Sequence, residues 1–567
     1  MKKDEYFFEY PDFENIKQIV YDVVKKYPNN KAFIVKNKEN DKVTYRNICF
    51  TELLEEVNNF GAGLYKLGLK DKKIAIISKN RYEWALSYIS ILLGNMIAVP
   101  LDKGLTEIEI ENSIERSNPD AIIFDNRISE HILKMKENIN VKQYICMDKN
   151  ENFISIEEII KLGKEAREKG FKEFDEAQID SDKLSVLCFT SGTSAKSKIV
   201  MLSQKNIASD IVAMHATEDF RSTDVNLAFL PLHHTFGSTG ILYLLSYGAA
   251  TAFPDGLRYI SQNLKEYQVS VFIGVPLLIE AMYKKIMKEV ENQGKTKIVN
   301  IAKKVTNIAP FTKRKVFKSI IDQLGGKLRL IISGAAGLDK DVWKAFNEMG
   351  IKIIQGYGLT EASPVVAAEN FKYGKQGSIG FPLKGVKVKI FDKNELGIGE
   401  LAVQGPNVML GYFDDEEANK EIFRDGWLLT GDLAYIDKEG FIFITGRKKN
   451  VIVLKNGKNV YPEEIETLIN KIPIVKESMV FGMPKDDDVM VSVKVQYDEE
   501  YVKENYPNES QKELEKILWE KIKEINHTMP TYKYIKNLIL TKEEFIKTTT
   551  AKIKRFEEMK KIQNATN

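Results

Sequence analysis

A run of small hydroxyl residues and glycine, TSGTSAKSK, occupies residues 190–198 directly after the apolar run LSVLCF. Backbone N–H groups and hydroxyls in such a loop can close around phosphate oxygens, and Lys198 adds a positive charge. A plain Ser/Thr-rich surface loop is the alternative. The loop is not a Walker A sequence, because GxxxxGK[ST] occurs nowhere in the chain, so P-loop NTPase chemistry is disfavoured.

A second polar segment, QGYGLTEASP at residues 355–364, follows the apolar run IKII. Two glycines let a ligand approach the backbone closely. The ring of Tyr357 offers a flat face to a nucleobase, and Glu361 supplies a hard oxygen ligand suited to magnesium. A tight turn without a ligand is the alternative, and the segment alone leaves both interpretations open.

A third segment, GWLLTGDLAYIDKEGFIFITGRKKN, places Asp432 in a Thr-Gly-Asp sequence that we expect to be a turn, with Arg447 at a second turn. A carboxylate suits a ribose diol, and a guanidinium suits phosphate oxygens. Solvated charged turns are the alternative.

Helical patterns alternate with short apolar runs through the first three hundred or so residues, which predicts parallel sheets covered by helices. LLEEVNNFGAGLYKLGL precedes KIAIIS, and residues 84–101 predict a buried helix that ends near Gly94, followed by a buried strand, in preference to a membrane span. The Lys-rich residues 276–326 predict a solvent-facing helical insert.

From about residue 377 the sequence pattern predicts short strands and Gly-rich turns, and after Arg447 it predicts a compact α+β segment. We therefore expect an α/β fold. It has a large N-terminal domain (1–447) of helix-covered, mostly parallel sheets with a small β-rich subdomain (about 377–447), and a small, mobile α+β C-terminal domain (448–567).

Composition limits the partners. The 567 residues include 83 Lys and Arg against 80 Asp and Glu, a net charge of +3 without a basic tract, so nucleic acid is not expected. Three scattered cysteines and an opening without the apolar core of a signal peptide favour the cytoplasm. The Lys- and Glu-rich insert suits solubility first, and it leaves peripheral membrane contact, a monomer and a homodimer open.

Six segments in order resemble the core motifs of the adenylate-forming superfamily, which includes acyl-CoA synthetases, peptide-synthetase adenylation domains and firefly luciferase. They are TSGTSAKSKIVMLSQKN, SGAAGL (333–338), QGYGLTE, WLLTGD, GRKKNVIVLKNGKNVYPEEIE and KTTTAKIKR (547–555). PLHHTFG (231–237) and VLKNGKNVYPEEIE resemble the long-chain fatty acid CoA ligase branch. The resemblance implies an AMP-forming acyl-CoA synthetase that uses ATP and Mg²⁺ to join a long-chain fatty acid to coenzyme A through an acyl-adenylate.

The resemblance also implies roles for individual residues. Glu361 and the hydroxyl of Thr190 would hold Mg²⁺, and Lys552 would bridge the reacting carboxylate and the α-phosphate. Nucleotide contacts would come from Thr190, Ser191, Gly192, Thr193, Ser194, Lys198, Gly334, Ala335, Gln355, Gly356, Tyr357, Gly358, Thr360, Asp432 and Arg447.

Three further residues carry implied roles. Lys449 would be the pivot of a hinge between the two half-reactions, and the loop at Gly457 would line the passage for the pantetheine thiol. His234 occupies the tunnel-side histidine position, where gating of the acyl site and plain packing are both open.

The phosphate loop departs from the usual TSGTTGxPKG of the family, chiefly at Ala195 and Ile199, where glycines are common. We expect an active enzyme with slower turnover. Two alternatives remain: a ligase that passes the acyl group to an acyl carrier protein, and a catalytically weakened nucleotide- or acyl-binding homologue.

Overall fold

The computed structural model describes residues 10–39, 42–190, 197–217, 219–294, 312–455, 458–485, 488–548 and 552–566. The chain forms two compact units. The first holds the described parts of residues 1–190, 198–387 and 403–426, and the second holds those of 191–197, 388–402 and 427–567.

The first unit contains a large mixed sheet that within the described residues has nine strands, in the order β16-β15-β14-β13-β12-β10-β11-β1-β2. The strands from β14 through β10 and β11 to β1 run parallel, whereas β2, β15 and β16 are antiparallel additions. Their bounds are β1 Lys31–Glu39, β2 Lys42–Cys49, β10 Val225–Leu227, β11 Ala250–Ala252, β12 Val271–Gly274, β13 Leu330–Ser333, β14 Lys352–Gly358, β15 Val365–Ala368 and β16 Phe381–Pro382.

A second sheet in this unit has eight strands among the described residues, in the order β19-β9-β8-β4-β3-β5-β6-β7. The strands from β8 through β4 and β3 to β7 are parallel, and β9 and β19 are antiparallel. Their bounds are β3 Lys73–Ile77, β4 Ile97–Leu101, β5 Ala121–Phe124, β6 Gln143–Cys146, β7 Ile154–Ser155, β8 Leu184–Phe189, β9 Ile199–Ser203 and β19 Gly411–Tyr412.

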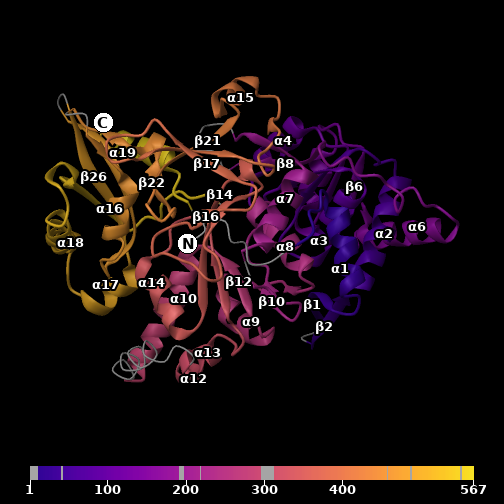
Figure 1. The fold of residues 1–567 in the computed structure, drawn as a ribbon, viewed down its shortest axis with the longest axis horizontal. Coiled ribbons are helices and arrows are strands. Elements are labelled where there is room, and N and C mark those ends of the chain that lie inside the picture. Colours follow the sequence, from indigo (N-terminus) through magenta and orange to yellow (C-terminus); the bar gives the residue numbers. More distant parts are fainter. Residues whose placement is uncertain are drawn as a thin grey trace. The chain divides into compact units, whose positions relative to one another are not determined.

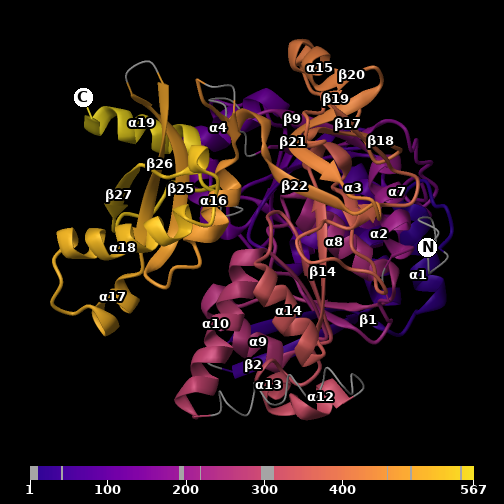
Figure 2. The same cartoon turned by 60° about the vertical axis from the view of Figure 1, so that its left-hand side comes forward.

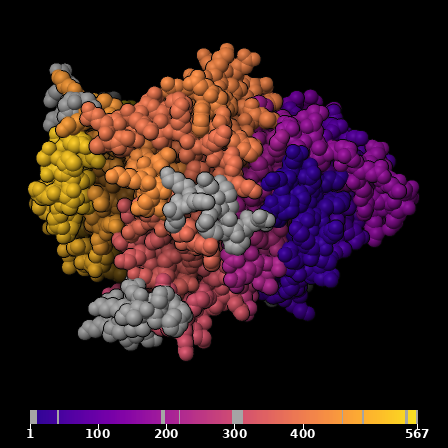
Figure 3. Space-filling view, viewed as in Figure 1, coloured from indigo at the N-terminus to yellow at the C-terminus, as the bar shows by residue number. Residues whose placement is uncertain are grey.

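Helices of the first unit pack beside these sheets, and α10 and α14 lie next to one another in both ribbon views (Figures 1 and 2). The N-terminal part of the chain, in indigo and purple, forms one continuous region of the surface in Figure 3. The helices are α1 Ile16–Lys26, α2 Phe50–Lys66, α3 Tyr82–Leu93, α4 Glu107–Ser117, α5 Ser129–Met135, α6 Ile156–Glu168, α7 Gln204–His215, α8 Thr235–Ser246, α9 Ile260–Glu266, α10 Pro276–Asn292, α12 Lys313–Val316, α13 Lys318–Gln323, α14 Lys340–Met349 and α15 Glu416–Ile422.

The apolar stretch at residues 84–101 folds as the sequence predicts. Helix α3 ends at its C-cap residue Gly94, and β4 follows in the interior of the second sheet. Burial of both elements explains why nearly every position is apolar. Within the described residues, no helix combines the length and the apolar character that crossing a membrane requires.

The Lys-rich insert is helical in its described parts, but the expectation that it faces solvent is wrong for one side of α10. Ile279, Met282, Ile286 and Val290 recur along that helix and are buried in the core beside the large sheet. Burying each side chain contributes about 1.5 to 3 kcal/mol. The lysines occupy the other positions, so the charge of the segment conceals an amphipathic helix.

A smaller sheet has the order β17-β18-β21-β20, with β22 paired to β21, and corresponds to the expected change to short strands. Its strands are β17 Lys387–Phe391, β18 Gly399–Gln404, β20 Phe423–Arg424, β21 Trp427–Ile436 and β22 Ile442–Arg447.

The rest of the second unit is α+β. Strands β25, β26 and β27 form a sheet whose apolar residues pack with α16 and α18 in one core, and β23 pairs with β24. The elements are β23 Ile452–Val453, β24 Asn459–Val460, α16 Pro462–Ile469, β25 Val475–Lys485, β26 Asp488–Tyr497, α17 Glu499–Asn505, α18 Gln511–Asn526, β27 Asn537–Thr541 and α19 Arg555–Thr566. The α/β class, with helix-covered, mostly parallel sheets and a smaller α+β part, is therefore confirmed, whereas the boundary at Arg447 and the mobility of the C-terminal part stay predictions.

Candidate functional site

The first cluster lies where β8 ends and β9 begins. Thr190 donates from its N–H and from its hydroxyl to the carbonyl oxygen of Lys198, at 2.9 and 3.2 Å. These two contacts hold the ends of the intervening segment together. Ser191, Gly192, Thr193 and Ser194, predicted to bind phosphate, lie outside the described residues.

Glu361 lies in a short 3₁₀ turn, Thr360–Ala362, that follows β14. Its backbone carbonyl accepts from the N–H of Met409 at 2.9 Å, and its carboxylate Oε1 accepts from the Tyr412 hydroxyl at 2.8 Å. The ring of Tyr412 in turn faces Lys198, whose Nζ lies 4.5 Å from the ring centroid. Thr190, Lys198 and Glu361, which the sequence assigned to one phosphate and metal site, are thus linked through Tyr412.

Electrostatics around this cluster keep the neighbouring groups neutral. Burial, followed by the charge of Glu361, raises the pKa of the Cys188 thiol to about 12. The same causes, with burial the larger, raise the pKa of Tyr412 well above its ordinary value. Tyr412 is therefore a neutral hydrogen-bond donor at physiological pH.

These oxygens suit magnesium. Glu361 offers a carboxylate and Thr190 a hydroxyl, and Mg²⁺ is commonly bound by one or two carboxylates together with substrate phosphates. Among the described residues, no group of three or more His, Cys, Asp or Glu side chains could hold a metal ion.

The segment QGYG is strand, not a turn. Gln355, Gly356, Tyr357 and Gly358 form the last part of β14 and pair with the antiparallel strand β15. A Cβ on Gly358 would lie 1.8 Å from the carbonyl oxygen of Pro364, so this glycine is required by the close approach of the two strands. The tight-turn alternative is wrong for these residues, because the hairpin partner extends the strand through both glycines.

Gln355 joins this strand to the turn that follows β13. Its side-chain oxygen accepts from the N–H of Leu338 at 3.2 Å, and its amide nitrogen donates to the carbonyl of Ser378 at 3.2 Å. Gly334 and Ala335 open the turn, and Ala335 adopts a left-handed conformation with φ of 73°. Two of the segments that the sequence singled out are therefore neighbours.

A buried carboxylate, that of Glu369, contacts the backbone of Gln355. It accepts from the backbone N–H of Gln355 at 3.0 Å, from Trp343 Nε1 at 3.0 Å and from the N–H of Lys375 at 2.8 Å. Burial outweighs these hydrogen bonds and raises the pKa of Glu369 to about 7. Sequence reasoning missed this residue, because one Glu after an apolar strand carries no signal of burial.

His234 is the N-cap residue of α8. The loop before it is held by Asn80, which donates to the carbonyls of Ala228 and Leu230 at 2.8 and 2.7 Å and accepts from the N–H of Leu232 at 3.2 Å. Asn80 follows β3 of the second sheet, so side chains from one sheet shape a loop of the other. Neither the spacing of these residues in the sequence nor their types predicted this contact.

Asp432 and Arg447 belong to the second unit, and the expectation that both occupy turns is wrong. They lie directly opposite each other on β21 and β22, with Arg447 Nε 3.0 Å from Asp432 Oδ1. The strand continues through Gly431, which has φ of 71°, because the Thr430 hydroxyl donates to the carbonyl of Leu401 and accepts from the N–H of Asp432. The two side chains form one cross-strand ion pair.

Lys552 is exposed and lies next to an antiparallel β-bridge. Lys547 and Ile553 form a β-bridge, and the N–H of Thr548 donates to the carbonyl of Lys552 at 2.8 Å. Arg555 forms ion-paired hydrogen bonds with the partly buried Glu466, with an N···O distance of 2.5 Å, at the start of α19. Lys449 lies in the 3₁₀ turn Lys448–Asn450, and Gly457 lies outside the described residues.

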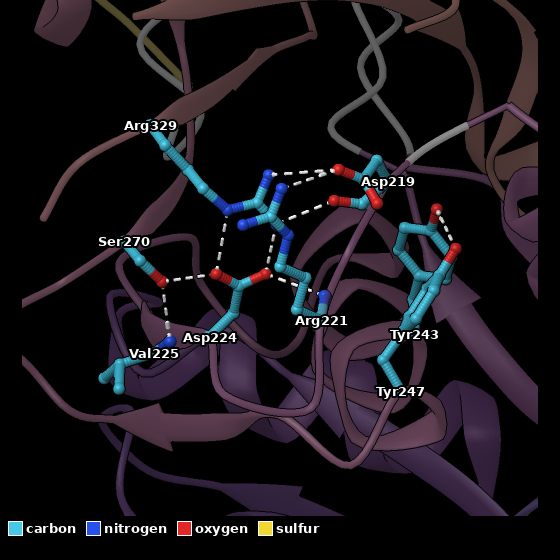
Figure 4. Close-up of polar contacts among 8 residues, drawn as sticks. All are labelled: Asp219, Arg221, Asp224, Val225, Tyr243, Tyr247, Ser270 and Arg329. Atoms are coloured by element: carbon cyan, nitrogen blue, oxygen red, sulfur yellow. Dashed lines mark hydrogen bonds and ion pairs between the residues drawn. The ribbon is translucent and has the colours of Figure 1, made fainter. Parts of the chain in front are cut away.

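The opposite end of the large sheet holds a different kind of cluster (Figure 4). Asp224 precedes β10 and receives two hydrogen bonds from Arg329, one from the Ser270 hydroxyl at 2.7 Å and one from the N–H of Arg221 at 2.8 Å. These residues line a hollow of about 740 Å³. None of the residues predicted from the sequence to act in catalysis lies there.

Comparisons with known proteins identify the family. A profile described as AMP-binding enzyme matches residues 20–413, and one described as AMP-binding enzyme C-terminal domain matches residues 449–564. Fatty acyl-CoA synthetase B of Dictyostelium discoideum is 29% identical over 497 residues, which cover 81% of this chain and 73% of that protein. A chloroplastic long-chain-fatty-acid–acyl-carrier-protein ligase of Arabidopsis thaliana is 27% identical over 524 residues, with 78% and 71% covered.

The fold comparison agrees. The solved structure of ATP-bound MatB from Rhodopseudomonas palustris is similar with a TM-score of 0.75 at 22% identity, and the alignment covers 98% of this chain and 100% of that one. At such identity the likeness concerns the fold. Since the first profile spans well over half of the residues and the second matches the C-terminal part, the chain belongs to the AMP-binding enzyme family.

Proposed function

We propose that this protein joins a long-chain fatty acid to coenzyme A through an acyl-adenylate, with release of pyrophosphate and AMP. The observation that carries the proposal is the contact chain from Thr190 through Lys198 and Tyr412 to Glu361. It supplies a hydroxyl, a cation and a carboxylate in one place on a chain of the AMP-binding enzyme family. Relatives named as fatty acyl-CoA synthetases support the choice of acid.

In the first half-reaction, an oxygen of the fatty acid carboxylate forms a bond to the α-phosphorus of ATP. The bond from that phosphorus to the bridging oxygen breaks, and its electron pair leaves with pyrophosphate. The protein contributes mainly position and charge neutralisation. Lys198 neutralises phosphate oxygens, while the strand Gln355–Gly358 and the turn at Gly334 and Ala335 receive the nucleoside.

Magnesium fits the oxygens of Glu361 and Thr190 and, when bound, neutralises charge on the departing phosphates. The chain itself orients these groups. The Glu361 carboxylate is held by Tyr412, and Thr190 is held by the carbonyl of Lys198.

Residues of the second unit complete the proposed chemistry. Asp432 binds the ribose hydroxyls, and its ion pair with Arg447 orients the carboxylate. Lys552 bridges the acid carboxylate and the α-phosphate, where two negative charges must approach. We also propose a C-terminal domain that begins at residue 448.

In the second half-reaction, the sulfur of coenzyme A bonds to the acyl carbon, and AMP leaves with the electron pair of the broken C–O bond. Lys449 serves as the pivot between the two reactions, and the loop at Gly457 lines the thiol passage. His234, at the start of α8, borders the acyl site.

An acyl carrier protein is the alternative acceptor, and it is favoured by one relative whose name states that activity. Equal concentrations of coenzyme A and holo-acyl carrier protein in one assay separate the two. Coenzyme A as the preferred acceptor supports the proposal, and acyl transfer to the carrier protein alone overturns it.

The principal test measures pyrophosphate release across carboxylic acids of about two to about twenty carbons, with and without coenzyme A. A buried methylene contributes about 0.8 kcal/mol, so the rate at low acid concentration should rise steeply with chain length. Release that peaks with acetate contradicts the long-chain assignment. No release with any acid indicates a weakened homologue.

Lys552→Ala tests the assignment of the C-terminal lysine. Loss of an electrostatic contact in the transition state lowers acyl-adenylate formation about a hundredfold or more. Thioester formation from preformed acyl-AMP should change little. Lys547→Ala, in the β-bridge next to Lys552 and paired with Glu477, is the matched control and should affect neither half-reaction.

A further inference from the structure

We propose that Tyr412 is a positioning residue for the phosphate and metal end of the site. Its hydroxyl fixes the Glu361 carboxylate and its ring fixes Lys198, so that the two opposite charges stay apart until a nucleotide binds. The inference rests on the proposed function for the identity of the ligands.

The backbone of Tyr412 is rigidly placed. Strand β19 pairs with β9, which puts Tyr412 opposite Val200, two residues after Lys198. Asn419 accepts from the N–H of Tyr412 at 2.6 Å and donates to its carbonyl at 3.0 Å. The side chain is only 3% exposed, so the ring has little freedom to move.

The hydroxyl orients one oxygen of the carboxylate. It donates to Glu361 Oε1 at 2.8 Å, and no other hydrogen bond to this carboxylate forms among the described residues. The second oxygen, Oε2, is thereby left for a ligand. Such supporting contacts to a metal-binding side chain commonly change metal affinity or activity by 10- to 100-fold when removed.

The ring performs a separate task. Lys198 lies 4.5 Å from its centroid, within the range of a cation–π contact. A lysine and a glutamate within reach of each other would ordinarily pair directly, which would withdraw both from a ligand. Within the described residues neither forms an ion pair, and each instead contacts Tyr412, Lys198 at the ring and Glu361 at the hydroxyl.

The test compares Tyr412→Phe, which removes the hydroxyl and keeps the ring, with Tyr412→Leu, which removes both. Tyr267→Phe is the control: Tyr267 is also buried, and its hydroxyl, which lines the hollow at the other end of the sheet, has no partner within the described residues. Calorimetry measures ATP binding over a range of Mg²⁺ concentrations and in EDTA. Pyrophosphate release is followed in parallel.

For Tyr412→Phe we expect the Mg²⁺ concentration for half-maximal ATP binding to rise about tenfold, with unchanged ATP binding in EDTA. For Tyr412→Leu we expect weaker ATP binding in EDTA as well, because Lys198 can then pair with Glu361. Adding Glu361→Gln to Tyr412→Leu should restore binding in EDTA, since the competing carboxylate charge is gone. Tyr267→Phe should match the wild type.

An unchanged Mg²⁺ requirement in Tyr412→Phe overturns the role of the hydroxyl. Unaltered EDTA binding in Tyr412→Leu, or no recovery in the double variant, overturns the role of the ring. A wild type that releases no pyrophosphate with any acid refutes the proposed function instead, and the Mg²⁺ dependence of ATP binding still decides the inference.

Discussion

Two buried carboxylates, at opposite ends of the large sheet, are stabilised in different ways. Asp224, before β10, receives the guanidinium of Arg329, a cation that matches its charge. Glu369, beside the carboxyl end of β13, accepts hydrogen bonds from three N–H groups, those of Gln355, Trp343 and Lys375. One end of the sheet is closed by an ion pair, whereas at the other end burial raises the pKa of the carboxyl group to about 7.

This difference indicates that the amino end of the sheet contributes to stability, whereas the carboxyl end is suited to binding ligands. A buried ion pair satisfies itself and has no charge to offer a ligand. At the carboxyl end, Glu361 and Lys198 are held by a neutral phenol, so their charges remain available. Ligands of open α/β sheets commonly bind outside the carboxyl ends of the strands. Substitutions at the two ends should therefore separate activity from stability.

Glu361→Gln should give the largest effect. The amide keeps the shape of the side chain and still accepts from Tyr412, but it loses the charge. We expect pyrophosphate release to fall about a hundredfold to a thousandfold, while the melting temperature shifts by no more than about 2 °C. A large loss of thermal stability would show that the Glu361 carboxylate stabilises the folded protein, which would contradict the proposed difference between the two ends of the sheet.

Asp224→Asn should do the reverse. It leaves the guanidinium of Arg329, whose side chain is 19% exposed, with a neutral partner, and breaking such a pair costs about 3 kcal/mol of unfolding free energy. Urea unfolding measures the loss. The kcat and KM of the folded fraction should match the wild type, and a changed KM for ATP would contradict a purely structural role.

Glu369 should make stability depend on pH. Its pKa in the folded protein, about 7, lies above its ordinary value of 4.5, so the folded state binds the proton more tightly than the unfolded chain does. Its contribution is fully present below about pH 4.5 and is lost as pH rises through about 7.

Glu369→Gln removes this titration. The unfolding free energy of the wild type minus that of the variant should fall by about 2 to 3 kcal/mol between about pH 5 and about pH 8. Thermal or urea unfolding across that range measures the difference. A difference that stays constant would mean that the three N–H donors balance the effect of burial on the charged form, and a difference that rises would mean that they outweigh it.

Arg221→Ala should give the smallest effect. The side chain of Arg221 is 59% exposed and pairs with Asp219 at the rim of the same cluster. Exposed ion pairs contribute little, so we expect a change within about 0.5 kcal/mol by urea unfolding. A small loss would show that the buried pair of Asp224 and Arg329 contributes most of the unfolding free energy of this cluster. A loss as large as that of Asp224→Asn would show that the exposed residues contribute comparably.

Much of the fold was predictable because local patterns and burial agree. The helix ending at Gly94 and the strand after it follow directly from an apolar run and its boundaries. Asp432 and Arg447 were predicted to be functional but were placed in turns. A glycine with positive φ inside a paired strand looks the same in sequence as a glycine in a turn.

The prediction that the Lys-rich insert faces solvent was wrong on one side of α10 for a related reason. Composition reports the average of all sides of a helix, whereas packing depends on one side. The buried positions of α10, from Ile279 to Val290, recur with helical spacing among many charges. Only that spacing distinguishes an exposed helix from one that contributes to the core.

The sequence by itself determined the family, the α/β class and the segments that carry hydroxyls, carboxylates and cations, because those properties reside in residue type and order along the chain. The tertiary structure alone decided which of these groups meet. Tyr412 lies 51 residues from Glu361, and Asn80 lies 148 residues from the carbonyl of Ala228 to which it donates. Such contacts depend on the pairing of distant strands, whose register no local pattern records.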